Sequence, residues 1–128
     1  MVEVIGHRGA STEAPENTLA ANDLAFQQKA DGVEVDVRLT KDKQLVCMHD
    51  KSAFRTAGKK NLINESTLKQ LESLDVGKWK GEKWSGEAIP SLHEVLSEIP
   101  IDKKIFIEVK EGIETIDPLI ETIQKSKL

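Results

Sequence analysis

The sequence predicts an α/β fold with a parallel sheet. Short β-branched runs, which are typical of buried strands, alternate along the chain with segments whose apolar residues recur at helical spacing. The 128 residues contain no internal repeat and no low-complexity tract, so one domain is expected. The expected strands are residues 2–6, 32–39, 45–48 and 104–109.

Apolar spacing and capping residues predict the helices. Two capping boxes are present, in which a Ser or Thr precedes a Glu or Gln by three positions. The last helix is expected to begin with Asp117 as its cap and Pro118 at its first position. The capping boxes are Thr67 with Gln70 and Ser91 with Glu94. The expected helices are residues 17–29, 67–74, 91–98 and 118 to the end of the chain.

The polar turn at 40–43 ends the second strand, and the run at 45–48 is expected to return beside it as a β-hairpin. The segment that follows, about 51–88, is rich in Lys, Gly, Asn and Ser and is expected to form an excursion with one short helix. It contains Trp79 and Trp84. We expect both to pack this excursion onto the rest of the domain, with contact to a lipid head group as the alternative.

Composition excludes several classes of protein. The net charge is -4, which does not favour a nucleic-acid partner. No apolar run reaches the length of a membrane-spanning helix, and the N-terminus shows no signal peptide, so a cytoplasmic location is expected. Cys47 is the single cysteine, which excludes a disulfide within the chain, and we expect it to be buried.

Charged residues two positions apart on two predicted strands point to a site. Side chains at that spacing lie on the same face of a strand, so Glu34 with Asp36, and Glu108 with Lys110, share a face opposite the valines and isoleucines. Burying three carboxylates together is costly unless a cation compensates them, and oxygen ligands favour Mg²⁺ or Ca²⁺. The alternatives are a strand with one solvated face and a solvent-exposed Glu–Lys pair.

Two histidines follow predicted strands. His7 stands in Gly6-His7-Arg8-Gly9 and His49 in Met48-His49-Asp50. Strand ends are where α/β barrels place their active sites, and two imidazoles can divide acid and base work near neutral pH. Arg8 between glycines suits a phosphate oxygen. His93 lies inside a predicted helix, so we interpret it as an ordinary surface or packing residue.

An ordered set of motifs resembles the glycerophosphodiester phosphodiesterase family, a group of phosphatidylinositol-phospholipase-C-like phosphodiesterases. The resemblance extends over nearly the whole chain. Its motifs are Gly6-His7-Arg8-Gly9, Pro15-Glu16-Asn17-Thr18, Glu34-Val35-Asp36-Val37, Thr40-Lys41-Asp42, His49-Asp50 and Ile107-Glu108-Val109-Lys110.

The resemblance implies a TIM (β/α)₈ barrel, of which residues 1–128 supply about three βα units and an insertion, about 51–88, over the barrel mouth. A closed barrel has eight units and about 250 residues, so we expect the rest of the barrel or another chain to be needed to close the fold. It also implies hydrolysis of a small-molecule glycerophosphodiester to glycerol 3-phosphate and an alcohol. A cyclic phosphate would form on the way, and one divalent cation, Mg²⁺ or Ca²⁺, would be required.

Carried over by position, the resemblance assigns roles to nine of the motif residues. Glu34, Asp36 and Glu108 would be metal ligands, and His7 and His49 the acid–base pair. Phosphate contacts would come from Arg8 and Lys110. Glu16 and Asn17 would support His7, although a capping role at the first helix is an alternative.

Two lysines depart from the family pattern. Lys29 and Lys43 stand where the family often has glycine, and a left-handed backbone there would cost each about 1 kcal/mol. Two other functions remain open from sequence: a related phospholipid phosphodiesterase, and a non-catalytic barrel fragment that serves as a binding module.

Overall fold

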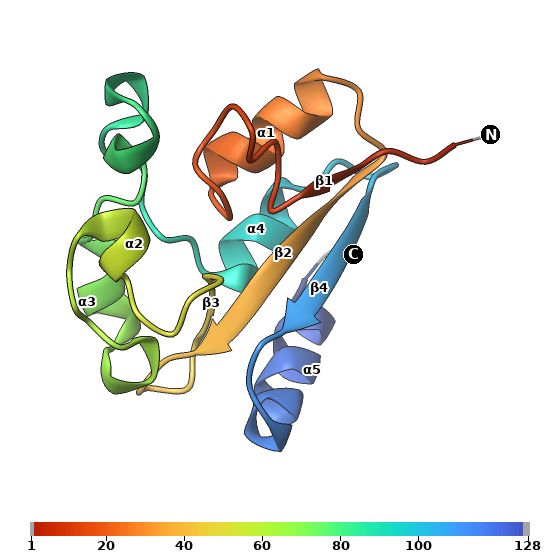
Figure 1. Ribbon diagram of the computed structural model, residues 1–128. Coiled ribbons are helices and arrows are strands. Elements are labelled where there is room, and N and C mark those ends of the chain that lie inside the picture. The colour runs from red at the N-terminus through yellow and green to blue at the C-terminus, as the bar shows by residue number, and fades with distance from the viewer. Residues whose placement is uncertain (1, 127–128) are drawn as a thin grey trace.

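A four-stranded sheet around β2 (Gly32–Leu39) forms the centre of the computed structural model, which describes residues 2–126 (Figure 1). β1 (Ile5–His7) and β4 (Lys104–Val109) pair in parallel with β2, one along each edge. β3 (Leu45–Cys47) pairs antiparallel with the C-terminal end of β2, on the same edge as β1. The predicted parallel sheet and the predicted hairpin are therefore both confirmed.

Three helices cover one face of the sheet: α1 (Leu19–Gln27), α4 (Leu92–Glu98) and α5 (Ile116–Lys125). Val33, Val35 and Val37 of β2 point into this layer and are fully buried. Burial of such side chains contributes about 1.5–3 kcal/mol each, so this face holds the elements together. Other members of the core are Ala25, Leu92, Val95, Leu96, Ile105, Ile107, Val109 and Leu119.

The order β1-α1-β2-α4-β4-α5 places three parallel strands side by side with their helices on one face. This is the arrangement of three consecutive units of a (β/α)₈ barrel, as predicted. Within residues 2–126, β4 pairs with β2 alone, and its Phe106 is 46% exposed on the face away from the helices. That opposite face also carries Glu34, Asp36 and Glu108, because side chains alternate along a strand.

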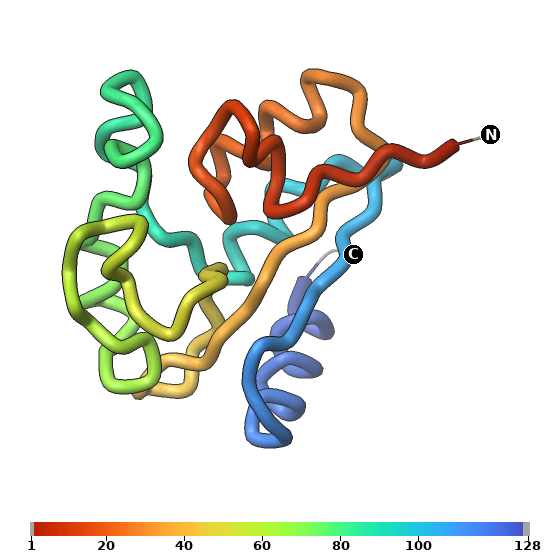
Figure 2. The backbone as a smooth tube through the Cα atoms, in the orientation of Figure 1, coloured from red at the N-terminus to blue at the C-terminus, as the bar shows by residue number. Residues whose placement is uncertain are grey.

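The segment between β3 and α4 forms a side lobe next to the C-terminal end of β2 (Figure 2). One short helix was expected there, but the lobe has two, α2 (Phe54–Ala57) and α3 (Leu68–Glu72). It also has 3₁₀ turns at Ile63–Glu65, Lys78–Lys80 and Glu82–Trp84. α3 is the helix expected at 67–74. The other pieces are too short to show an apolar period, so the sequence pattern missed them. A second small core joins the lobe to β3: Val46, Met48, Ile63, Leu71, Val76 and Ile89.

The capping residues were predicted well at two helices and wrongly at a third. Both capping boxes are present, at Thr67 for α3 and Ser91 for α4. α5, however, begins at Ile116 directly after a 3₁₀ turn, Ile113–Thr115. Asp117 and Pro118 therefore lie inside its first turn, and the prediction of Asp117 as the cap is wrong. The preceding turn supplies the helical backbone on which α5 continues.

Local backbone geometry agrees with the departures noted in the sequence. Lys29 and Lys43 both have positive φ, 69° and 62°, so each adopts the conformation that glycine favours. Cys47 is buried in the core, as predicted, and burial raises the pKa of its thiol far above the ordinary value. In the described part of the chain, none of the helices has the length and apolar character needed to cross a membrane.

Candidate metal and phosphate site

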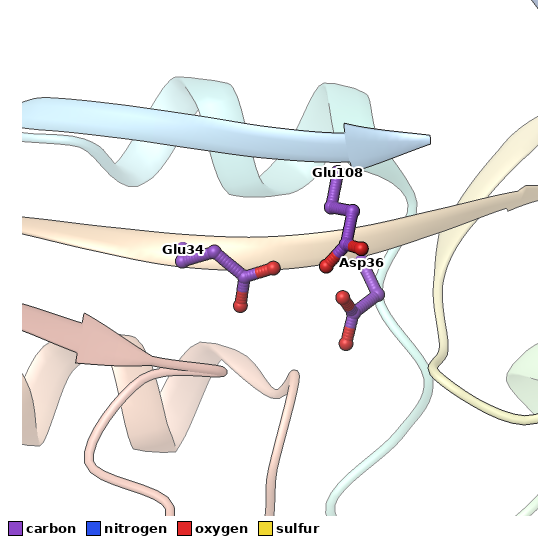
Figure 3. A group of neighbouring side chains, drawn as sticks. All are labelled: Glu34, Asp36 and Glu108. Atoms are coloured by element: carbon purple, nitrogen blue, oxygen red, sulfur yellow. The ribbon is translucent and has the colours of Figure 1, made fainter. Parts of the chain in front are cut away.

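Three carboxylates meet on the open face of the sheet. Glu34 and Asp36 project from β2 and Glu108 from β4, all toward one another (Figure 3). One oxygen of each lies within 4.8 Å of one oxygen of the other two. The register explains this meeting, because Asp36 pairs with Glu108 across the parallel ladder and Glu34 stands two positions before Asp36.

Crowding and burial shift the ionisation of this cluster. Burial, reinforced by the neighbouring Asp36 carboxylate, raises the pKa of Glu34 to about 7. Burial also opposes ionisation of Asp36, but hydrogen bonding led by the Asn17 amide holds the pKa of that carboxyl below its ordinary value. Ionising all three carboxylates together is therefore unfavourable, and a bound cation would relieve the repulsion between them.

Asn17 holds Asp36 in place through both its side-chain atoms. Its amide nitrogen donates to Asp36 Oδ2 at 3.0 Å, and its amide oxygen accepts from the Asp36 backbone N–H at 3.1 Å. Asn17 is buried and has φ of 57°, a left-handed conformation that Asn tolerates better than most residues. The cap of α1 is Thr18, whose hydroxyl accepts from the Ala21 N–H, so a capping role for Asn17 is wrong.

The cationic residues of the site already contact its acids. Arg8 Nε lies 3.3 Å from Asp36 Oδ2, and Arg8 Nη1 donates to Glu16 Oε2 at 3.3 Å. The backbone N–H of Arg8 donates to Glu34 Oε1, and Arg8 has φ of 58°. A non-glycine residue in this conformation is strained and such strain is common at functional sites. Lys110, which directly follows β4, donates through Nζ to Glu108 Oε1 at 3.2 Å.

His7 lies next to the carboxylate cluster, whereas His49 is linked to it only through other residues. His7 is the last residue of β1, is 67% exposed in its side chain, and has Nε2 3.8 Å from Glu34 Oε1. His49 follows β3, and its Nδ1 lies 2.8 Å from Asp50 Oδ1. Beyond this hydrogen bond, ion pairs connect His49 to Asp36. They run from Asp50 through Arg55, Glu16 and Arg8.

Three residues of this neighbourhood had been given no role from the sequence alone. Arg38 donates to the His49 carbonyl through Nε and Nη2, at 2.9 and 2.6 Å. Its position, two after Asp36 on the same strand face, was the signal that could have found it. Asp50 adjoins His49 in sequence. Arg55 had no local signal, because its partner Glu16 is 39 positions away.

The residues present fit a hard divalent cation. Within residues 2–126, Glu34 Oε2 and Asp36 Oδ1 are buried oxygens without a hydrogen-bond partner, and both belong to the cluster. Buried carboxylate oxygens are seldom left unpaired, so a positive ligand is the natural partner. All three donors are carboxylates, which is the set that Mg²⁺ and Ca²⁺ prefer.

Comparison with known proteins decides the family. Residues 7–128 match the model of the glycerophosphoryl diester phosphodiesterase family. The chain belongs to this family. A glycerophosphodiester phosphodiesterase of Caldanaerobacter subterraneus subsp. tengcongensis is 46% identical to it over 111 residues, which are 86% of this chain and 46% of that protein. A Bacillus subtilis enzyme of the same name is 34% identical over 137 residues, covering 97% of this chain and 46% of its own length.

Solved structures of phosphodiesterases in the family superpose closely on the fold. An Oleispira antarctica phosphodiesterase, solved in complex with the product sn-glycerol-3-phosphate, matches with a TM-score of 0.92 and 38% identity. The match covers 98% of this chain and 53% of the other. A glycerophosphodiester phosphodiesterase from Thermotoga maritima matches with a TM-score of 0.83 and 35% identity, over 99% and 52% of the two chains. The 128-residue chain thus spans about half the length of the relatives it matches.

Proposed function

We propose that the protein hydrolyses glycerophosphodiesters to glycerol 3-phosphate and an alcohol, with a divalent cation at Glu34, Asp36 and Glu108. The observation that carries the proposal is the convergence of three carboxylates from two strands, with buried oxygens left unpaired within residues 2–126. Membership of the family supports the reaction. The sn-glycerol-3-phosphate bound to the related Oleispira antarctica protein supports the product.

Glu34, Asp36 and Glu108 would hold the cation, which would supply Lewis acidity that eases deprotonation of the glycerol 2-hydroxyl. Arg8 and Lys110 flank the carboxylates and bind the phosphate oxygens through charged hydrogen bonds. Both already contact the cluster, Arg8 at Asp36 and Lys110 at Glu108, so a phosphate there lies within reach of each. Stabilising the charge that develops on these oxygens lowers the barrier of the displacement.

His7 and His49 divide the proton transfers. One imidazole accepts the proton of the glycerol 2-hydroxyl as its oxygen attacks phosphorus, and the other donates a proton to the oxygen of the departing alcohol. The product of this step is a cyclic phosphate. Water then opens the ring with the two roles reversed, so both histidines return to their starting states.

The test is hydrolysis of glycerophosphocholine by the purified protein with its barrel complete, because residues 1–128 supply only about three of the eight βα units and are expected to show little activity alone. Release of glycerol 3-phosphate is measured with Mg²⁺, with Ca²⁺ and with EDTA. Glu34→Gln removes one charge from the cluster while keeping its shape. His93→Gln is the matched control for a histidine variant, because His93 is exposed on α4, outside the site.

The expected result is hydrolysis that depends on the cation, is lost in Glu34→Gln and His49→Gln, and is unchanged in His93→Gln. Absence of hydrolysis with either cation would leave the chain a non-catalytic binding module. Activity on a phospholipid with none on glycerophosphocholine would assign it instead to the related lipid phosphodiesterases. Full activity of Glu34→Gln would refute the role given to the carboxylate cluster.

A further inference from the structure

A series of ion pairs and hydrogen bonds connects the side lobe to His49. Its central member is Arg55 of α2. The Arg55 guanidinium donates to two carboxylates at once. Nη1 and Nη2 bond Glu16 Oε1 and Oε2 at 2.9 and 2.7 Å, while Nε and Nη2 bond Asp50 Oδ2 and Oδ1 at 2.9 and 3.2 Å. Paired bonds of this kind fix a carboxylate in orientation as well as in position, which a lysine cannot do.

Asp50 in turn bonds the ring of His49. Asp50 Oδ1 lies 2.8 Å from His49 Nδ1. Hydrogen bonds from Arg55 are the main reason that the pKa of Asp50 falls to about 2, so this carboxyl is ionised at neutral pH. An ionised carboxylate can only accept a hydrogen bond, and therefore Nδ1 must carry the proton. His49 is thereby held as the tautomer whose Nε2 keeps its lone pair.

Further contacts restrict both Arg55 and His49. Trp79 packs its ring on the Arg55 guanidinium, 5.6 Å from Cζ to the ring centroid, and its indole N–H donates to the Val76 carbonyl. At the other end, Arg38 grips the backbone carbonyl of His49. The imidazole is thus fixed through its backbone by β2 and through its ring by the lobe.

We propose that Arg55 is a positioning residue for His49, which it controls by orienting Asp50 and so selecting the imidazole tautomer. The reactive state of His49 then depends on the docking of the side lobe, through Arg55 and Glu16, onto the loop between β1 and α1. This inference rests on the proposed function for its catalytic meaning, but the tautomer itself is a property of the folded chain.

The experiment measures the tautomer and the kinetics separately. Long-range ¹H–¹⁵N NMR of the imidazole nitrogens reports the tautomer of each histidine, and the chain has only three. The variants are Arg55→Met, which removes all four hydrogen bonds, and Arg55→Lys, which keeps the charge but not the paired geometry. Lys80→Met is the matched control, because Lys80 also lies over Trp79, at 5.5 Å from its ring centroid. Far-ultraviolet circular dichroism and thermal melting establish that each variant is folded.

In the unaltered protein and in Lys80→Met, we expect His49 to carry its proton on Nδ1. In Arg55→Met the Nε2–H tautomer should gain population, and kcat should fall by about tenfold to a hundredfold with KM nearly unchanged, as for other residues that orient a functional imidazole. Arg55→Lys should lie between the two. His7 and His93 should keep their spectra.

A His49 tautomer that is the same in Arg55→Met as in the unaltered protein would overturn the inference, whatever happens to kcat, and would leave Arg55 as a clamp of the lobe alone. Alternatively, the tautomer changes in Arg55→Met but the unaltered protein does not hydrolyse glycerophosphocholine. This result would refute the proposed function and leave the positioning of the imidazole intact. The two failures are therefore distinguishable.

Discussion

Replacement of Asn17 tests whether this residue supports the acidic cluster. Asn17→Ala removes both hydrogen bonds to Asp36, at 3.0 and 3.1 Å, in a buried site. The bond to the charged carboxylate contributes about 1.5–3 kcal/mol and the bond to the backbone N–H about 1 kcal/mol. Alanine must also adopt the φ of 57°, which costs about 1 kcal/mol more. We therefore expect the free energy of unfolding to fall by about 3.5–5 kcal/mol, the sum of these contributions.

Asn17→Gly separates the two contributions, because it loses the same hydrogen bonds without the strained φ. Its unfolding free energy should lie about 1 kcal/mol above that of Asn17→Ala. The assay is urea denaturation at pH 7 in EDTA, followed by circular dichroism. A loss below 1 kcal/mol in both variants would mean that Asp36 does not depend on Asn17, and the description of the site would be wrong at this point.

Three further predictions concern stability and reactivity. The Asp50 pKa of about 2 predicts that stability from its ion pair with Arg55 is present at neutral pH and is lost as pH falls from about 4 toward 2. Solvent reduces this contribution to about 1 kcal/mol at a partly exposed pair. The unfolding free energies of Asp50→Asn and the unaltered protein, measured by urea denaturation, should therefore differ by that amount at pH 7 and converge near pH 2. A difference that does not change with pH would contradict this prediction. Lys43→Gly relieves the positive φ and should raise the unfolding free energy by about 0.5–1 kcal/mol, whereas destabilisation would argue for a contact of the lysine side chain. Cys47 should react with a thiol reagent only in denaturant, because it is buried and its pKa is raised; fast reaction of the native protein would refute its burial.

The regular part of the fold was predictable because its apolar pattern is periodic. β2 and β4 were placed at their observed bounds, since three valines or isoleucines occupy alternate positions in each. The two capping boxes were likewise visible in sequence. The rest of the side lobe was not predictable, because α2 and the 3₁₀ turns of the lobe are held by short-range backbone hydrogen bonds that leave no periodic pattern in the sequence.

The site divides in the same way. The sequence predicted that three carboxylates lie close together, because strand alternation and parallel order fix which side chains share a face. These are Glu34, Asp36 and Glu108. The connection from Asp36 to His49 could not, since Arg55 meets Glu16 across 39 positions of sequence. Contacts of that span depend on how the lobe docks, which no local pattern specifies.

We propose that carboxylates from β2 and β4 hold one divalent cation. Isothermal titration calorimetry of the metal-free protein with Mg²⁺ and with Ca²⁺ measures this directly, using Glu108→Gln as the test variant and Glu98→Gln, an exposed residue of α4, as the charge-matched control. We predict one ion bound per chain, with affinity at least about tenfold weaker in Glu108→Gln and unchanged in Glu98→Gln. Equal affinity in all three proteins, or no binding of either ion, would contradict the account.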